Sequence, residues 1–558
     1  MSTLYRGGFV YSPVDPFANA MVVDDATGTI AWIGGDDAAA VHADAVDEVV
    51  ELDGALVTPA FVDSHAHVSQ TGAVLRGVDL TTTRSRDEAL SRVEDAARKA
   101  RGRAVYAPNW DETTWADARL HTAAELDRAA YGGVVYSPRV DGHSAVISSA
   151  LAAASGARDL PGWHGDGLVS REAHHAAREA FNAAVTPAQR RDDIDLALRT
   201  AAAAGLGLIH ENGGRTLSSV EDFADVLAAG ERGDGPQTIG YWAQLVADEQ
   251  EARDVATLHR AHGLAGDLNI DGSIGSRTAS LRTDYADASG HRGNAYLTVG
   301  QVRDHVAACS LAGLQAGFHV IGDAGVDTAV AGFEAAAELV GAPLVTRARH
   351  RLEHLEMVSR DGIERLARLG VSASVQPAFD AAWGGGQGMY AARLGADRVR
   401  GRGTGNVGPM NPFATMMAAG LTVALGSDSP VTAFAPWEAV RACVNHHEEG
   451  QRVSARSAFL AHTRGGWRAA GFDDRGYLDL GLPATFAVWS VGDLVVQAPD
   501  QRIQTWSTDP RSGTPGLPDL SPGAPAPVCL RTAVRGRTVF DSGALEPVAA
   551  GAATPGST

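Results

Sequence analysis

Short apolar segments alternate with alanine-rich helical segments through the middle of the chain. Because strands that alternate with helices form parallel sheets, this order predicts an α/β fold. Eight segments have the length and composition of buried strands: 55–62, 134–140, 206–210, 267–271, 315–320, 349–354, 371–376 and 421–426. Eight such strands close a TIM-type (β/α)8 barrel, in which catalytic residues lie at the C-terminal ends of the strands. We assign the barrel to residues 59–480.

The two ends of the chain have a different pattern, with short strands separated by turn residues. Such strands occupy residues 1–58 and return in residues 481–545, so we predict one small β-sandwich built from both termini. The Pro/Gly/Ser-rich stretch 512–527 is expected to be a long loop, and residues 546–558 a disordered tail. The segment of about 69–133 is too long for an ordinary connection, and we expect it to be inserted over the barrel mouth.

The composition and the net charge of the chain limit the classes of molecule that it is expected to bind. The formal net charge of −20 over 558 residues argues against nucleic acid or an anionic membrane. Three separated cysteines indicate neither a disulfide framework nor a cysteine-based zinc site. No signal peptide and no apolar run of about 18 residues is visible, so a cytoplasmic protein with a small-molecule substrate is expected. Lys99, the only lysine, lies on the charged face of a predicted helix, which argues against a catalytic lysine.

The most informative residues are His65 and His67, which follow the apolar run that ends in Phe61 and Val62. On a strand, residues two apart point to the same side, so the two imidazoles converge at the end of the strand. Two imidazoles at that spacing make half of a zinc-type site. Two hydrogen-bonded loop histidines are an equally good interpretation of this pair alone.

Four other candidate strands also carry a potential metal ligand near their ends: Glu211, His319, His354 and Asp428. For each residue alone, a structural hydrogen bond is the simpler interpretation. Together they place imidazole and carboxylate groups on one rim of one barrel, a combination that chance rarely produces.

Seven short segments of the chain, taken in their order, resemble the amidohydrolase superfamily of metal-dependent hydrolases, and within it the amidohydrolase-3, YtcJ-like family. The resemblance covers nearly the whole chain and rests on Val57–His67, Asp141–Ala145, Asp271–Ala279, His319–Asp323, Arg351–His354, Val375–Pro377 and Leu425–Val431. It implies a distorted TIM barrel with a β-sandwich made from both termini, as the pattern itself predicts.

The resemblance also implies roles. His65, His67, His319 and His354 would be metal ligands, and Asp428 would bind metal and move the proton. A divalent metal lowers the pKa of bound water and polarises the scissile carbonyl, while a carboxylate can pass the proton to the leaving nitrogen. One or two zinc ions suit this set, although mixed nitrogen and oxygen ligands also admit manganese, iron or cobalt.

The chain departs from the family at one position. Many relatives have a metal-bridging lysine four residues before the Asp-Gly of the fourth strand, where this chain has Asp267. Aspartate is much shorter than a carboxylated lysine. Glu211 resembles the glutamate that replaces the lysine in other branches, so Glu211 is the preferred carboxylate ligand, with Asp267 as the alternative.

Substrate-facing candidates are His143, which aligns with a family histidine, Trp110 and Asp111 in the inserted segment, and Arg277. Alternatively, His143 is a turn histidine, the aromatic residues of the insertion form its own small core, and Arg277 forms a structural ion pair. The pairs 174–175 and 446–447, all histidines, lie on polar helical stretches and are expected to be solvated.

The sequence thus predicts a hydrolase that uses metal-activated water on a carbon–nitrogen bond of an amide, N-acyl or N-formyl compound. A homo-oligomer is compatible with the sequence. Two alternatives remain open at this point: a deaminase of a ring amidine, which needs the same water, and a non-catalytic scaffold. Retention of the whole ligand set disfavours the scaffold.

Overall fold

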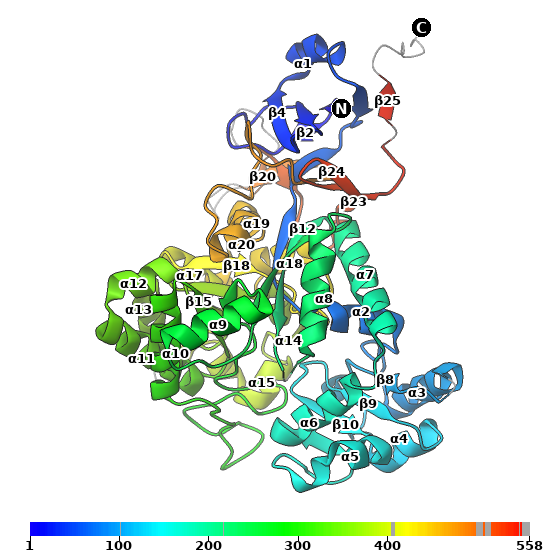
Figure 1. Ribbon diagram of the computed structural model, residues 1–558, viewed down its shortest axis with the longest axis vertical. Coiled ribbons are helices and arrows are strands. Elements are labelled where there is room, and N and C mark those ends of the chain that lie inside the picture. Colours follow the sequence, from blue (N-terminus) through cyan, green and yellow to red (C-terminus); the bar gives the residue numbers. More distant parts are fainter. Residues whose placement is uncertain are drawn as a thin grey trace.

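The computed structural model describes residues 1–100, 102–215, 217–402, 408–497, 506–507, 515–545 and 547–549. Figure 1 shows three parts along the longest axis: a β domain that holds the N-terminus, a central barrel, and a smaller α/β unit at the opposite end. Among the described residues, no helix is both long enough and apolar enough to cross a membrane.

The centre of the molecule is a parallel barrel of eight strands. Seven parallel pairings join neighbouring strands of the barrel. A further parallel bridge, between Ala66 and Ser429, connects the segment after the last strand to the first strand. In chain order the strands are β7 (Phe61–Ala66), β12 (Leu206–Gly213), β13 (Gln237–Trp242), β14 (Gly263–Leu264), β15 (Gln315–Val320), β16 (Arg351–His354), β17 (Ser372–Val375) and β18 (Thr422–Leu425). The prediction of an α/β fold with a TIM-type barrel is confirmed.

Two of the predicted strands need correction, and one barrel strand was not predicted. Residues 134–140 contain β9 (Val135–Pro138), which belongs to another sheet, whereas β13 supplies the barrel strand that the sequence analysis missed. β13 was hard to find because Gln237, Thr238 and Gly240 break its apolar pattern. The fourth barrel strand is β14, which ends before the predicted 267–271, so Asp267 lies beyond it.

Helices surround the barrel, and local signals mark where several begin. The capping boxes at α7 and α10 pair Thr186 with Gln189 and Thr298 with Gln301, satisfying amide groups at the first turn. The helices that follow barrel strands include α2 (Val68–Arg76), α7 (Pro187–Ala203), α8 (Val220–Glu231), α9 (Glu249–His259), α10 (Val299–Ala312), α11 (Asp323–Val340), α13 (Arg360–Arg368), α17 (Phe413–Ala418), α18 (Pro436–Val444), α19 (Ala455–Ala461) and α20 (Arg464–Ala469). Their apolar faces and the strands form the main hydrophobic core.

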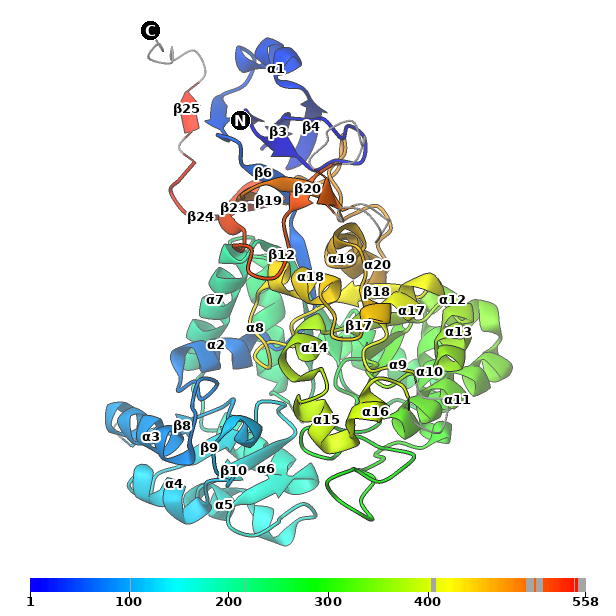
Figure 2. The ribbon, with the colours of Figure 1, turned by 180° about the vertical axis from the view of Figure 1, so that it is seen from behind.

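The inserted unit is longer than the predicted 69–133. Its four-stranded sheet, ordered β11-β10-β9-β8, and its helices fill the chain between α2 and α7. The strands are β8 (Val105–Tyr106), β9, β10 (Ser144–Ile147) and β11 (Leu168–Ser170), and the helices are α3 (Arg86–Ala100), α4 (Ala123–Ala129), α5 (Ser149–Ser155) and α6 (Arg171–Asn182). The unit has apolar clusters of its own. Figure 2 shows it below α2 at the barrel end away from the β domain.

Both termini build the β domain, as predicted. One five-stranded sheet has the order β25-β5-β1-β3-β4 and the other β2-β6-β19-β23-β24. The strands are β1 (Ser2–Arg6), β2 (Phe9–Val10), β3 (Ala20–Asp24), β4 (Thr29–Gly34), β5 (Glu48–Glu51), β6 (Leu56–Pro59), β19 (Phe486–Ser490), β23 (Val528–Val534), β24 (Arg537–Asp541) and β25 (Pro547–Ala549). Side chains from both sheets, among them Tyr5, Met21, Val57 and Phe486, share one apolar cluster.

Two predictions at the C-terminal end change. Residues 547–549, expected in a disordered tail, form β25 and pair antiparallel with β5; residues 546 and 550–558 lie outside the described part. The expected long loop 512–527 contains the short strand β22 (Leu517–Pro518), which pairs with β20 (Leu494–Gln497), while residues 512–514 are outside the described part.

Candidate metal centre

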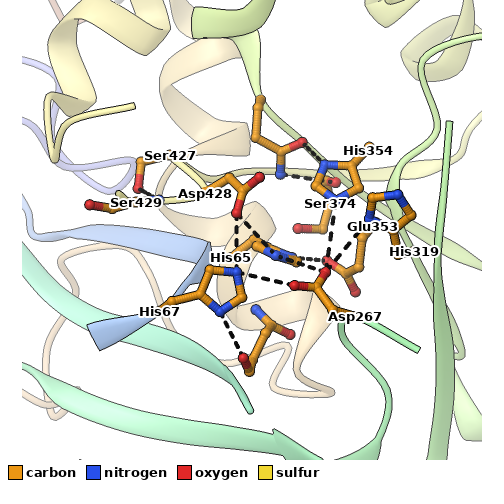
Figure 3. A network of polar contacts seen from close by, with 12 residues as sticks. His65, His67, Asp267, His319, Glu353, His354, Ser374, Ser427, Asp428 and Ser429 are labelled. Carbon is orange, nitrogen blue, oxygen red and sulfur yellow. Dashed lines mark hydrogen bonds and ion pairs between the residues drawn. The ribbon is translucent and has the colours of Figure 1, made fainter. Parts of the chain in front are cut away.

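Six titratable side chains converge at the C-terminal mouth of the barrel. They come from the ends of β7, β14, β15, β16 and β18, and Figure 3 shows them around a common centre. The residues are His65, His67, Asp267, His319, His354 and Asp428, all of them buried except the partly buried Asp267. All the strand-end candidates that the sequence indicated, except Glu211, therefore meet in one place, together with Asp267.

Asp267 lies between the histidines. Its carboxylate oxygens are 3.5 Å from His65 Nε2, 3.2 Å from His67 Nε2, 3.7 Å from His319 Nδ1 and 4.0 Å from His354 Nε2. Because all four imidazoles present a ring nitrogen to the same carboxylate, the nitrogens surround one small volume.

Asp428 closes the other side of this volume. Its Oδ1 lies 3.2 Å from His67 Nε2 and 3.4 Å from His65 Nε2. The backbone N–H of Asp428 donates to the carbonyl of His65, and that of His67 donates to Ser429. These two bonds tie the segment after β18 to the end of β7, so the aspartate and the His-x-His pair are held together.

The backbone turns sharply at two of these positions. His354 has φ +68° and Asp428 has φ +54°, in the left-handed region that residues other than glycine rarely occupy. His354 directly follows Glu353, and regular strand alternation would point neighbouring residues to opposite sides. Such unfavourable backbone conformations concentrate at functional sites, where the surrounding structure maintains them.

Hydrogen bonds fix which nitrogen of each imidazole faces the centre. The Nδ1 atoms of His65, His67 and His354 contact Glu353 Oε2 at 2.8 Å, the Asn212 carbonyl at 2.8 Å and Gln376 Oε1 at 2.7 Å. For these three rings, Nε2 is left to face Asp267.

His319 is turned the other way. Its Nε2 lies 3.3 Å from the carbonyl of Gly272, and its Nδ1 faces Asp267. Outer partners of this kind fix the tautomer and orientation of metal-binding histidines.

Electrostatics favour a bound cation. Burial raises the pKa of Asp267, but the attraction of His65 and the hydrogen bonds of His319 and His67 outweigh it, so the pKa lies well below its usual range. Burial, with a further contribution from His319, lowers the pKa of His354 to about 3. Burial lowers the pKa values of His65, His67 and His319, but the nearby carboxylates outweigh it and raise all three. The site thus combines ionised carboxylates with imidazoles that attract positive charge, and a metal ion that binds there takes the place of the protons.

The residues fit a divalent transition metal. Two sets of three ligand atoms lie within 4.8 Å of one another: His65, Asp267 and His354, and His65, His67 and Asp428. Within the described residues, the buried His65 Nε2 and Asp267 Oδ1 have no hydrogen-bond partner. Buried polar atoms are normally paired, and nitrogen and carboxylate ligands suit zinc, manganese, iron or cobalt.

The preference for Glu211 as the carboxylate ligand is not supported by this geometry. Glu211 is buried in β12, where its Oε2 accepts a hydrogen bond of 2.8 Å from the backbone N–H of Val68. Burial raises its pKa to about 7. The Glu211 carboxylate thus accepts a hydrogen bond from the first turn of α2. Asp267, the alternative ligand, lies among the histidines.

His143 is placed at the site, as the sequence suggested. Its ring centroid lies 4.8 Å from that of His319, and it lines a cavity that also reaches His67, Asp267 and Asp428. The neighbouring Asp141 explains part of the Asp-Gly-His-Ser motif, because it accepts hydrogen bonds from the barrel loop residues Ser273 and Ser276.

The structure places the other three substrate-facing candidates away from the metal centre. Trp110 is fully buried in the core of the inserted unit, and its indole N–H donates to the carbonyl of Ser137. Asp111 accepts a 2.9 Å bond from Arg139. Arg277 forms a two-pronged ion pair with Asp287, at 3.0 and 2.7 Å. Within the described residues, none of the three lines the cavity at the metal centre.

The histidine pairs expected to be solvated are partly misassigned. His174 is buried, with its Nε2 2.7 Å from the hydroxyl of Tyr136, and together with His175 it lines the cavity. His446 is buried and bonds to the carbonyl of Asn411, whereas His447 is half-exposed. Lys99, expected to be exposed, is exposed.

The cavity above the metal centre lies between barrel and insertion. It measures about 1420 Å³ including space open to solvent. The insertion contributes an aromatic wall of Tyr106, Tyr136 and Phe181, with ring centroids 5.4–5.9 Å apart, and the guanidinium of Arg178. Neither the aromatic wall nor Arg178 was predicted from the sequence.

A parallel barrel with imidazoles and carboxylates at the carboxyl ends of its strands is the architecture of a metal-dependent hydrolase. Residues 48–540 match the model of the Amidohydrolase family. This match covers most of the chain, so the protein belongs to that family and is a hydrolase.

Individual relatives are distant. The chain is 26% identical to Protein LONG AFTER FAR-RED 3 of Arabidopsis thaliana (79% of each chain covered), and 26% identical to "Putative amidohydrolase YtcJ" of Bacillus subtilis strain 168 (81% of this chain, 85% of the relative). It is 23% identical to the N-substituted formamide deformylase of Arthrobacter pascens (79% and 84%). A solved structure of an uncharacterized metal-dependent hydrolase from Pyrococcus furiosus has the same fold, with TM-score 0.67, 23% identity, and 88% and 98% coverage.

Proposed function

We propose that this protein hydrolyses a carbon–nitrogen bond of a small amide, N-acyl or N-formyl compound, with zinc held by His65, His67, His319, His354 and Asp267. The observation that carries the proposal is the position of Asp428, a carboxylate within 3.4 Å of two of these imidazoles at the floor of an open cavity. The family, and a formamide deformylase among the relatives, support amides as the substrate class.

When bound, the divalent metal supplies a Lewis acid that lowers the pKa of water and polarises a carbonyl. The residues of the chain do the rest. Asp428 accepts a proton from the attacking water and returns it to the leaving nitrogen. Glu353, Asn212 and Gln376 keep three imidazoles aimed at the centre. His143 lines the cavity beside His319 and, in this proposal, contacts the substrate.

The test is a hydrolysis screen combined with metal analysis. Enzyme as purified, enzyme treated with a chelator, and chelated enzyme supplied with zinc, manganese, iron or cobalt are assayed on N-acyl and N-formyl amides. We expect activity in the first sample, less than about a tenth of it after chelation, and recovery with zinc, because a metal-based mechanism needs occupied sites.

The products separate the alternatives. Amide hydrolysis releases an amine and a carboxylate, whereas a deaminase releases ammonia from a ring amidine. Ammonia release without amide hydrolysis would replace the proposal by the deaminase, and a pure protein with no bound metal and no activity would favour the scaffold. Better recovery with manganese, iron or cobalt than with zinc would overturn the choice of metal alone.

A further inference from the structure

His143 reaches the metal centre from the insertion, yet its ring is not fixed by hydrogen bonds of its own. The ring centroid lies 4.8 Å from that of His319. Within the described residues, neither ring nitrogen of His143 has a hydrogen-bond partner. His65, His67 and His354 differ, because a partner at Nδ1 fixes each of these rings. The place of the His143 ring therefore depends on how the backbone around it is held.

Asp141 holds this backbone and ties it to the barrel. Its Oδ1 accepts a 3.2 Å bond from the backbone N–H of His143. Two serine hydroxyls of the barrel loop 272–276 donate to the same carboxylate at 3.0 Å. The carbonyl of Gly272, at the start of this loop, lies 3.3 Å from Nε2 of His319. One barrel loop thus contacts His319 directly and holds His143 through Asp141.

Two buried arginines connect the insertion to this loop a second time. Arg139 donates to Asp141 at 2.8 Å and to Glu112 at 2.9 Å. Glu112 also accepts a 2.7 Å bond from Arg393, which follows β17 in the chain. Arg393 in turn donates to the carbonyl of Gly275 at 3.1 Å. A closed set of contacts, which we call the docking circuit, therefore crosses the boundary between insertion and barrel; its members are Arg139, Glu112, Arg393, Asp141 and the loop 272–276.

The space around Gly275 shows how closely the docking circuit is packed. A methyl group at this position would lie 2.5 Å from Oδ2 of Asp141 and against Nη1 of Arg139. Non-bonded atoms normally stay about 3.5–4.0 Å apart. Both atoms that would clash are the ends of side chains, so alanine at this position would push the ion pair of Arg139 and Asp141 apart without moving a strand of the barrel. The docking circuit therefore requires glycine at this position.

We propose that Asp141 is a positioning residue: through the docking circuit it holds His143 against His319, where His143 contacts the substrate. The inference rests on the proposed function, which gives His143 this contact. Small displacements matter in catalysis, because a shift of about 1 Å can cost about a hundredfold in rate. Hydrogen bonds between charged groups suit this task, since they are short and directional. The insertion is thus part of the active site, and its docking completes the site.

The first experiment is a set of double-mutant cycles, measured on an N-acyl or N-formyl amide that the wild-type enzyme hydrolyses. Asp141→Asn, Glu112→Gln, Gly275→Ala and His143→Asn should each lower kcat/KM by about tenfold to a hundredfold. In the His143→Asn background, each of the other three changes should cost less than about twofold more, because residues that act through one group are not additive. A merely structural role would give the same loss in both backgrounds.

Matched controls are available for two of these variants. Gly300→Ala makes the same change as Gly275→Ala in α10, where the nearest heavy atom is 3.9 Å away. Glu338→Gln repeats the change of Glu112→Gln at an exposed glutamate of α11. Both controls should keep kcat/KM within about twofold of wild type. If Glu112→Gln does not fold, as judged by circular dichroism, Gly275→Ala decides the test, because it removes no hydrogen-bonding group.

The second experiment needs no substrate. Hydrogen exchange followed by mass spectrometry reports how firmly the segment 139–144 is held. Exchange in this segment should be at least about tenfold faster in Gly275→Ala than in Gly300→Ala, while the metal content stays at the wild-type level. Unchanged exchange would overturn the docking circuit. Loss of metal would show that the loop 272–276 acts on His319 rather than on His143, and this would also overturn the proposal.

The outcomes separate this inference from the proposed function. Losses that add to that of His143→Asn would show that Asp141 does not act through His143, and would leave amide hydrolysis standing. Faster exchange of the segment 139–144 in Gly275→Ala, in a protein that hydrolyses no amide, would overturn the function and support the docking circuit. Wild-type kcat/KM in His143→Asn would take the substrate contact away from His143 and overturn the inference.

Discussion

His65 and Glu353 form a buried pair in which Nδ1 of the imidazole lies 2.8 Å from Oε2 of the carboxylate. Arg351 anchors the same carboxylate with bonds of 2.6 and 2.9 Å. Burial raises the pKa of Glu353, but the attraction of Arg351 and the hydrogen bond of His65 outweigh it and hold the pKa below its usual range. The ionised carboxylate therefore selects the tautomer of His65 that presents Nε2 to the metal centre.

Glu353→Gln should weaken metal binding by about 10–100-fold, the usual effect of losing an outer partner of a metal-binding histidine. The measurement is a competition titration with a chromophoric zinc chelator on the folded protein. The variant should also unfold more easily, because Arg351 loses its buried partner, at a cost of about 3–5 kcal/mol. Metal affinity equal to that of Glu338→Gln would show that the orientation of His65 does not depend on Glu353.

Asp267 and Glu211 make a second, paired prediction. Asp267→Asn should lower the metal content to well under half of wild type, because it removes the charge that faces four imidazoles. Glu211→Gln should keep the wild-type content, since the amide oxygen of glutamine can still accept the bond from Val68. Elemental analysis of both variants decides. Metal loss in Glu211→Gln together with full metal in Asp267→Asn would reverse the assignment.

The sequence predicted the ligands that stand at the ends of recognisable strands. His65 and His67 end an apolar run, and Asp428 follows another, so their meeting at one rim follows from the barrel. Asp267 could not be chosen in the same way, because its strand β14 has only two residues and Asp267 lies beyond its end. The choice between Asp267 and Glu211 depends on tertiary distances that no local pattern contains.

Residues whose roles depend on tertiary contacts could not be identified from the sequence either. Trp110 and Arg277 have the chemistry of substrate contacts, but Trp110 packs inside the insertion and Arg277 pairs with Asp287 ten residues away. Glu353 had a weak signal, since Arg351 and Glu353 are charged residues two apart in a buried strand and so share a side. The sequence underestimates the insertion because β9 begins with the apolar residues Val135 and Tyr136, as a barrel strand could.

Acid should destabilise the protein through its buried histidines, and His350 is the clearest case. Its Nδ1 accepts a 2.8 Å bond from the backbone N–H of Ala316, and its Nε2 contacts the hydroxyl of Ser310, an arrangement that requires the neutral ring. Burial, with a further contribution from His305, lowers its pKa to about 3. In the unfolded chain the pKa of histidine is about 6.5.

The sign follows from these two values. Between about pH 6.5 and 3 the unfolded state binds a proton that the folded state does not, so stability is present above pH 6.5 and falls with decreasing pH, by about 1.4 kcal/mol per pH unit for each such histidine. His350→Asn keeps an acceptor for Ala316 and should reduce the slope between pH 6 and 4 by that amount. Urea denaturation followed by tryptophan fluorescence gives the slopes, and equal slopes for wild type and variant would contradict the prediction.

Asp428→Asn tests the proton-transfer role. The carboxylate lies 3.2 Å from His67 Nε2, and the backbone of Asp428 is held to the carbonyl of His65. Asparagine is nearly isosteric and tolerates the left-handed φ of +54° at this position, so we expect the variant to fold. Its amide cannot accept the proton of the attacking water. General acid–base catalysis is typically worth about 10²–10⁴-fold, and turnover at saturating metal should therefore fall at least about a hundredfold. Metal content is measured in parallel, because Asp428 also belongs to one of the two ligand sets. A variant with full metal that retains more than about a tenth of wild-type turnover would take the proton-transfer role away from Asp428, since even the low end of that range predicts a larger loss.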